Sequence, residues 1–187
     1  MRKVLISIAA LAVVLAAAAL QAKEIVLTPA RVATIVSPED ARDARVLLCF
    51  DLPQELLEGK VKVENAALLF GGAIEDADFG LVHIFPATTA WRAAASVSWN
   101  SPWETAGGDF TKAIAGKSVT LKGADGAKEI SSNVTFIVMD WVSGRLANNG
   151  LILVPSQEDL VNSAGKFGFD TGSLKLRIEC SAWLGPQ

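Results

Sequence analysis

The sequence predicts an all-β protein, an antiparallel β-sandwich of jelly-roll type that carries one short α-helix. Short segments rich in Val, Ile, Leu and Thr recur along the chain and are separated by turns with Gly, Pro, Asn or Asp, as expected of strands. In residues 133–144 the apolar side chains instead recur at spacings of three and four, which gives one apolar stripe on a helix. These side chains are Val134, Ile137, Val138 and Trp141.

The chain begins with the three regions of a secretory signal peptide, which we assign to residues 1–22. Arg2 and Lys3 precede an apolar run, and small residues end that run before Lys23. Residues 23–187 then form a single exported domain, periplasmic or extracellular. An uncleaved anchor helix is the alternative, although the run is short for a membrane span and no second such run follows. The net charge of −3, without a basic cluster, gives no indication of nucleic-acid binding.

The strands are expected at residues 24–28, 31–36, 45–52, 61–70, 80–85, 118–122, 151–154 and 173–182. The last of them alternates apolar and charged side chains, as a half-solvated strand does. Residues 151–154 form a continuous apolar run, which indicates a buried strand. Residues 91–117 show little periodicity, and long irregular stretches of this kind usually carry function or are disordered.

Two further signals place the helix and the turn that follows it. Asn133 or Thr135 can accept a hydrogen bond from a free N–H group of the first helical turn. Gly144 offers a stop, and Asn149-Gly150 supports a tight turn into the next strand.

Several segments match those of one known family in the same order. They are RVLLCFDL at 45–52, VENAALLF at 63–70, Trp91 with VSWNSP at 97–102, GGDF at 107–110, residues 133–144 with NNGLIL at 148–153, and LKLRI at 174–178. Over about residues 25–180 the chain thereby resembles the secreted β-sandwich modules called DNRLRE domains, which overlap with carbohydrate-binding module family 96. It departs from them at Asn133, which replaces an Asp, at alanines 93–95, which replace a Glu, and at residues 166–170, which lack a Ser-x-Glu. The resemblance implies a secreted, non-catalytic module that binds polysaccharide.

Cys49 and Cys180 are the only cysteines, and an even count in an exported chain favours a disulfide. Both fall in expected strands, one early and one last, and the first and last strands of a sandwich are often neighbours. We therefore expect a Cys49–Cys180 bridge. Two buried free thiols that act as small apolar residues are the alternative.

Catalysis has little support in the sequence. His83 is the only histidine, lies in an apolar strand, and is accompanied by no Gly-x-Ser-x-Gly motif. Paired carboxylates can hydrolyse glycosides, but nothing in the spacing of the acidic loop residues selects a pair. These residues are Glu75, Asp76, Asp78, Glu104 and Asp109. We expect no cofactor, although loop carboxylates could hold a structural Ca²⁺.

The tryptophans are the best functional clue, because the apolar faces of sugar rings stack on indoles. Trp91, Trp99 and Trp103 fall within thirteen residues. We expect the ligand site at Trp91 and Trp103, with Trp103 as the exposed stacking surface and Glu104 and Asp109 as partners for hydroxyl groups or Ca²⁺. For Trp99 packing inside the protein is the stronger expectation, and for Trp103 a loop clamped onto the sandwich edge is the alternative.

Two functions follow from this pattern. The first is a secreted, non-catalytic module that binds polysaccharide at the cell surface or outside the cell. The second is an extracellular structural or adhesive domain whose loops contact protein components of a surface or matrix. Resemblance of fold does not separate them.

Overall fold

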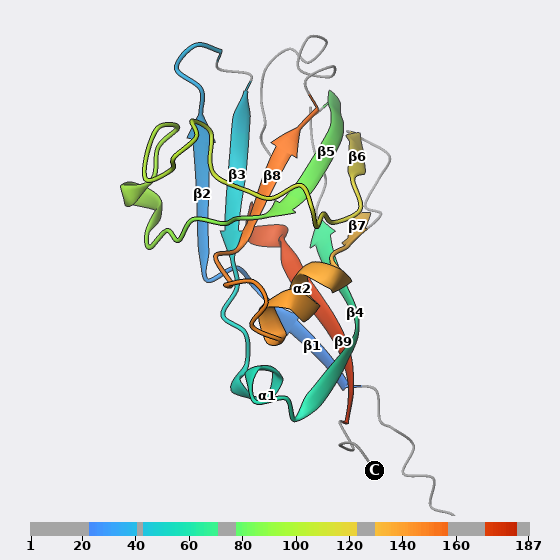
Figure 1. Cartoon of the computed structure of the whole chain (residues 1–187). Helices are drawn as coiled ribbons and strands as arrows, with labels where there is room; N and C mark the ends of the chain where they lie inside the picture. Colours follow the sequence, from blue (N-terminus) through green and yellow to red (C-terminus); the bar gives the residue numbers. More distant parts are fainter. Residues whose placement is uncertain (1–22, 41–42, 71–77, 123–129, 157–170, 183–187) are drawn as a thin grey trace, which may run out of the picture.

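The structure is a computed structural model that describes residues 23–40, 43–70, 78–122, 130–156 and 171–182. Its strands form two antiparallel sheets that pack face to face, which confirms the predicted β-sandwich (Figure 1). The signal peptide assigned to residues 1–22 lies outside the described residues, as do Glu75, Asp76 and residues 166–170.

The first sheet, called sheet A, has the strand order β1-β9-β4-β7. These strands are β1 (Lys23–Leu27), β9 (Lys175–Ala182), β4 (Val61–Phe70) and β7 (Ile130–Asn133). The strand β7 has no counterpart among the sequence predictions. Its four residues, Ile-Ser-Ser-Asn, are mostly polar, and they pair only with β4 at the sheet edge.

The second sheet, called sheet B, has the strand order β2-β3-β8-β5-β6. These strands are β2 (Arg31–Val36), β3 (Ala44–Cys49), β8 (Leu151–Pro155), β5 (Asp78–Pro86) and β6 (Val119–Lys122). The topology is that of a jelly roll once the edge strand β2 is left out and the other eight strands are counted in chain order. Sheet A then contains the first, eighth, third and sixth strands, side by side in that order. Sheet B contains the second, seventh, fourth and fifth.

Helix α2 (Thr135–Val142) confirms the predicted helix, and it lies against β4 (Figure 1). The N-cap position is Val134, and Asn133 Oδ1 accepts a hydrogen bond from the N–H of Thr135 at 3.1 Å. Gly144 follows the helix with a φ of 72°, as expected of its stop. The structure also describes the single turn α1 (Gln54–Leu57) and the 3₁₀ turns η1 (Ala94–Ser96) and η2 (Thr171–Ser173). Within the described ranges, no helix has the length and apolar character to cross a membrane.

The inner core lies between the two sheets and is closed at one end by α2. Alternation along the strands supplies its side chains, because successive residues of a strand point to opposite faces. On β3 and β8 these are Val46, Leu48, Leu151 and Leu153, all of which are buried. Trp141 is also buried in this core, as the helical pattern predicted.

The expected Cys49–Cys180 disulfide is wrong, since both cysteines are free and buried. Cys180 of β9 packs in the inner core. Cys49 belongs to β3 in the other sheet and points to the outer face of that sheet, beside Arg31, whose Nη2 lies 2.7 Å from its Sγ. The first and last strands do pair, but the partner of β9 is β1, so the earlier cysteine lies on the wrong sheet and the wrong face.

Candidate functional site: a groove on the outer face of sheet B

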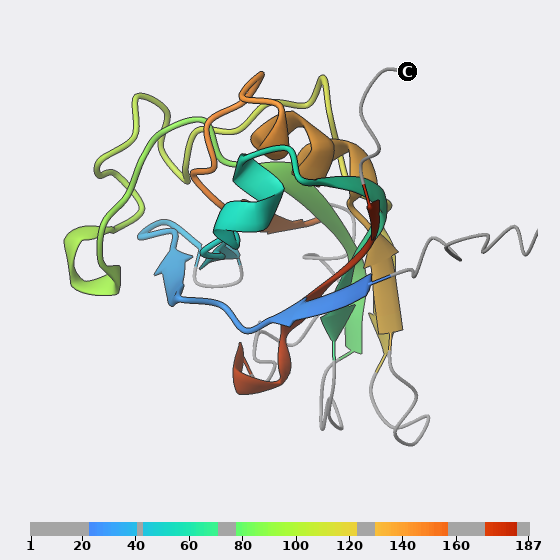
Figure 2. The same ribbon diagram turned by 90° about the horizontal axis from the view of Figure 1, so that it is seen from below.

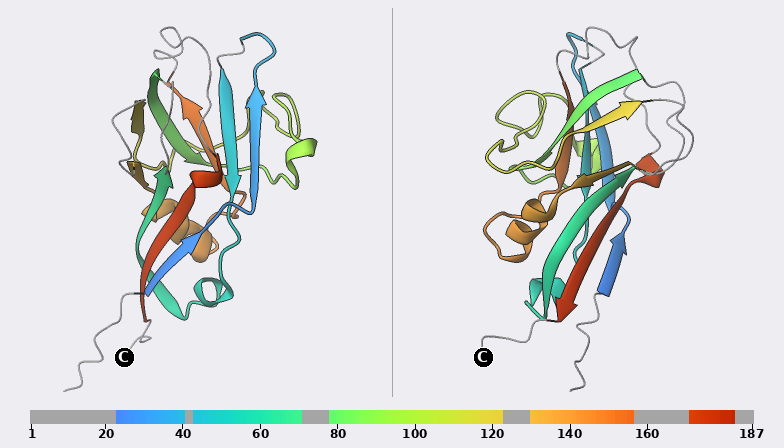
Figure 3. Two further views of the ribbon diagram at one scale, coloured as in Figure 1. Left: turned by 180° about the vertical axis from the view of Figure 1, so that it is seen from behind. Right: turned by 90° about the vertical axis from the view of Figure 1, so that its right-hand side faces the viewer.

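The outer face of sheet B is covered in part by residues 87–118, called the outer loop, which link β5 to β6. In Figure 1 this loop crosses in front of β3 and β8, and Figure 2 shows it outside the sandwich, next to β2. Figure 3 shows from behind that sheet A lies on the opposite side. The loop and the sheet bury a second apolar cluster, called the outer cluster. Its buried members are Ala33, Ile35, Leu47, Cys49, Trp91, Trp103 and Ile152.

Trp91 and Trp103, which the sequence predicted as ligand-binding residues, are structural members of this cluster. Trp91 is 4% exposed and Trp103 7%, so the expected exposure of Trp103 is wrong and neither indole offers an open face. Each ring N–H is also satisfied within the protein: Trp91 Nε1 donates to Asn149 O at 2.9 Å and Trp103 Nε1 to Ser98 O at 2.8 Å. The alternative of a loop clamped onto the sandwich describes this region.

The predicted strand that ends at Trp99 is reduced to a single bridge between Ser98 and Ser101. Trp99 itself is half-buried against the outer cluster.

The Gly107-Gly108 pair explains how the loop lies so close to the sheet. Both glycines have positive φ, 87° and 99°, which side chains other than glycine rarely adopt. A Cβ atom on Gly107 would lie 2.5 Å from Arg45 Nη1, and one on Gly108 would lie 2.7 Å from Ile152 Cδ1. The GGDF motif therefore begins with two residues that allow the backbone to rest directly on sheet B.

Asp109, the third residue of that motif, is held by the loop. Its Oδ2 accepts hydrogen bonds from Thr89 Oγ1 at 2.6 Å and from the N–H of Glu104 at 2.9 Å, and its Oδ1 accepts one from the N–H of Thr105 at 2.8 Å. Desolvation acts to raise the pKa of Asp109, but these three hydrogen bonds together hold it below its ordinary value. Asp109 thus fixes a turn and does not extend a free carboxylate toward a ligand.

Glu104, the fourth predicted ligand-binding residue, is exposed, and its own N–H donates to Asp109. Among the described residues no three His, Cys, Asp or Glu side chains are placed to hold a metal ion.

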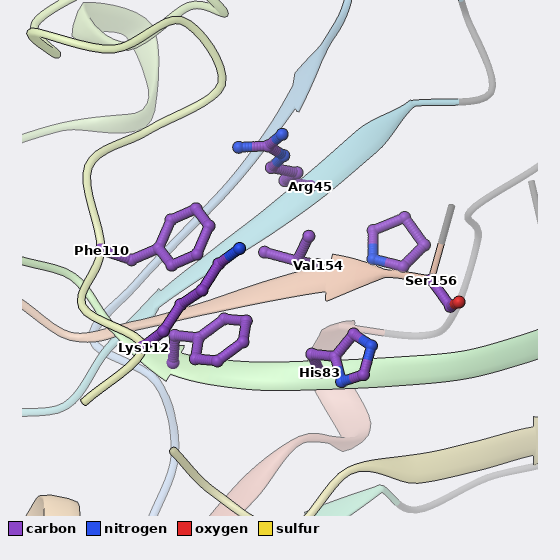
Figure 4. A pocket seen from close by; sticks show the side chains of 8 residues that line it. Arg45, His83, Phe110, Lys112, Val154 and Ser156 are labelled. Atoms are coloured by element: carbon purple, nitrogen blue, oxygen red, sulfur yellow. The ribbon is translucent and has the colours of Figure 1, made fainter. Parts of the chain in front are cut away.

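Where the outer loop leaves sheet B uncovered, a groove of about 430 Å³ lies on the outer face (Figure 4). β5, β8, β3 and the end of the loop supply its walls. Its lining residues are Arg45, His83, Phe85, Phe110, Lys112, Val154, Pro155 and Ser156.

Stacked rings form one side of this groove. Phe85 of β5 and Phe110 of the loop lie nearly parallel, with ring centroids 4.9 Å apart and planes at 17°. His83 continues the row at 6.0 Å from Phe85, and its Nδ1 lies 2.8 Å from Ser118 Oγ. Aromatic side chains with a few polar groups around them are typical of sites that bind small molecules or sugars.

Arg45 and Lys112 bring positive charge to the groove. Lys112 is exposed, whereas the side chain of Arg45 is only 13% exposed and lies 3.7 Å, Nε to Oδ1, from Asp43. Burial lowers the pKa of Arg45, and the neighbouring carboxylate of Asp43 opposes that effect. Burial raises the pKa of Asp43, Arg45 opposes the rise, and Asp40 adds to it.

The sequence predictions missed most of this groove. The sequence held one signal for it, in β5. Val82 and Ile84 point into the inner core, and side chains alternate along a strand, so the rings of His83 and Phe85 must face outward. Lys112 and Ser156 carry no such signal, because both lie outside the strands and reach the groove only through the fold of the irregular segments that contain them.

The comparisons with known proteins give no assignment, since no family model and no curated protein matches the chain. The resemblance to DNRLRE domains stays a prediction.

Proposed function

We propose that this protein is a secreted, non-catalytic module that binds polysaccharide in the groove of sheet B. The observation that carries the proposal is the Phe85–Phe110 pair, which borders an open groove. An imidazole, an ammonium group and a hydroxyl group line the same groove. The exposed parts of these two partly buried rings offer apolar contact to the C–H groups of a sugar, while Lys112, Ser156 and His83 meet the hydroxyl groups or acidic substituents. The order of sequence motifs that resembles DNRLRE domains is a second support.

The groove replaces the site expected at Trp91, Trp103, Glu104 and Asp109. Both indoles are buried, so a sugar has no access to their faces, and the Asp109 carboxylate already accepts three hydrogen bonds from its own loop, which leaves only Glu104 exposed. These residues support the site indirectly, because they hold the loop that carries Phe110 and Lys112.

A glycan array on residues 23–187, followed by calorimetry with laminarin, xylan and polygalacturonate, tests the proposal. Phe85→Leu should lower affinity at least tenfold with little change in the melting temperature, since the ring is lost but most of the apolar volume stays. Phe136→Leu is the matched control: this phenylalanine is 71% exposed on α2 and takes no part in the groove. Unchanged affinity in Phe85→Leu would place the site elsewhere.

The alternative, an extracellular structural or adhesive domain, has one observation in its favour. Phe136 is an exposed ring, and Leu57 on α1 is 54% exposed. Such side chains can pack against a partner protein, although a contiguous apolar patch, rather than single side chains, marks a contact surface. Failure of the wild-type chain to bind any glycan on the array would make this second function the better one.

A further inference from the structure

Arg45 joins the outer loop to sheet B through several contacts of one side chain. This residue belongs to β3, a central strand of sheet B, and its side chain extends over the outer face, where it lines the groove. Three different parts of the loop contact its guanidinium group. The group lies 4.7 Å from the Trp99 ring centroid and 5.7 Å from that of Phe110, and Nη1 donates to Gly107 O at 2.6 Å.

These contacts need the shape of arginine as well as its charge. A guanidinium group is planar, can lie over an aromatic ring and can donate along its edge at the same time, whereas an ammonium group presents a point charge. The fit is close, since even a Cβ atom on Gly107 would lie 2.5 Å from Nη1. The carboxylate of Asp43, whose Oδ1 lies 3.7 Å from Nε, adds an electrostatic attraction that favours this position of the group.

The contacts reach the groove through Phe110. Gly107 and Phe110 are three residues apart in the loop, and Phe110 stacks on Phe85 to form the aromatic side of the groove. Figure 4 shows Arg45 and Phe110 on the same side of the groove, with Lys112 following from the loop. Arg45 therefore contributes to the position of Phe110 against Phe85, together with the backbone bridge that pairs Phe110 with Ala87.

We infer that Arg45 is a positioning residue for ligand binding: it clamps the outer loop to sheet B and thereby sets the aromatic wall of the groove. The part that concerns affinity rests on the proposed function. The part that concerns the loop does not.

The test uses Arg45→Lys and Arg45→Met, with Arg92→Lys and Arg92→Met as matched controls on an exposed arginine of the same loop. Amide hydrogen exchange is measured over residues 98–111, and affinity is measured with laminarin, xylan and polygalacturonate. Both Arg45 variants should raise exchange in this segment at least tenfold while β4 and β9 stay protected, and both should lower affinity at least tenfold. The Arg92 variants should change neither quantity.

A second variant leaves the arginine itself in place. Gly107→Ala sets a methyl group against Nη1 and should reproduce the faster exchange and the weaker binding with the charge unchanged. Arg45→Lys carries the test of the arginine itself if Arg45→Met does not fold, because Gly107→Ala also strains a backbone with a φ of 87°. Retention of affinity and of slow exchange in Arg45→Lys would overturn the inference, because charge alone would then suffice. If the wild-type chain binds none of the three polysaccharides, the proposed function fails, and hydrogen exchange alone decides whether Arg45 holds the loop.

Discussion

The inner core and the outer cluster bury similar side chains by different means. The inner core is made by regular strands and α2, and alternation places each of its residues. The outer cluster has one regular face, sheet B, and one irregular face, the outer loop. The position of this loop on the sheet depends on the Gly107-Gly108 pair, on hydrogen bonds of the indoles and on the turn fixed by Asp109. A sandwich can thus gain a third layer without a third sheet, provided that the loop satisfies its own polar groups.

The largest effect is expected in the inner core. Trp141→Ala should lower the free energy of unfolding by about 3–5 kcal/mol, because the ring is buried between α2 and the sheets and regular elements on both sides limit collapse of the cavity. Urea unfolding followed by circular dichroism measures it. A loss below that of Trp103→Ala would contradict the ranking of the two clusters.

In the outer cluster the same truncation should cost less. Trp103→Ala should lower the free energy of unfolding by about 2–3 kcal/mol, since an irregular loop can settle into part of the cavity. It should also raise hydrogen exchange in the outer loop while β4 and β9 remain protected. Loss of protection throughout both sheets would show that the two clusters unfold as one unit.

Asp109 links the outer loop to pH. Because its pKa is depressed in the folded state, its contribution is fully present above the pKa of the unfolded chain, about 3.9, and is lost as pH falls through the lower folded value. Asp109→Asn should therefore lower the free energy of unfolding by about 1–2 kcal/mol above pH 5, because the charged carboxylate accepts hydrogen bonds but is only partly shielded from solvent. Unfolding experiments from pH 2.5 to pH 7 should show this difference shrinking below about pH 4, and a constant difference would contradict the assignment.

The smallest effect is expected at the start of α2. Asn133 Oδ1 accepts one N–H of the first turn, and Thr135 Oγ1 accepts the N–H of Ala66 at 2.9 Å, so the two residues share the task of fixing this end of the helix. Asn133→Ala should cost about 0.5–1 kcal/mol. Thermal unfolding of Asn133→Ala and Trp141→Ala in parallel compares the two losses of stability. A larger loss in Asn133→Ala would contradict the placement of the helix.

Much of the sandwich could be predicted because its strands are marked by alternation or by apolar runs, and α2 by its stripe. The burial of Trp91 and Trp103 could not be predicted, since an irregular segment carries no period that says which way a side chain points. A usable signal lay elsewhere: apolar runs in β3 and β8 indicate strands covered on both faces, so something had to lie over Leu47, Cys49 and Ile152. The cysteine prediction failed for a related reason, because strand position along the chain does not fix the face of the sheet.

The two free cysteines lie in different buried layers, so the reactivity of each thiol reports on the opening of one layer. Cys49 lies in the outer cluster and Cys180 in the inner core. Burial, followed by the negative charge of Glu55, raises the pKa of the Cys180 thiol against the opposing Lys23, which slows its reaction with alkylating agents. Modification of Cys49 therefore records each opening of the outer layer, and modification of Cys180 records separation of the sheets. A time course of alkylation, read peptide by peptide in a mass spectrometer, can therefore follow both events in the native chain without an introduced label.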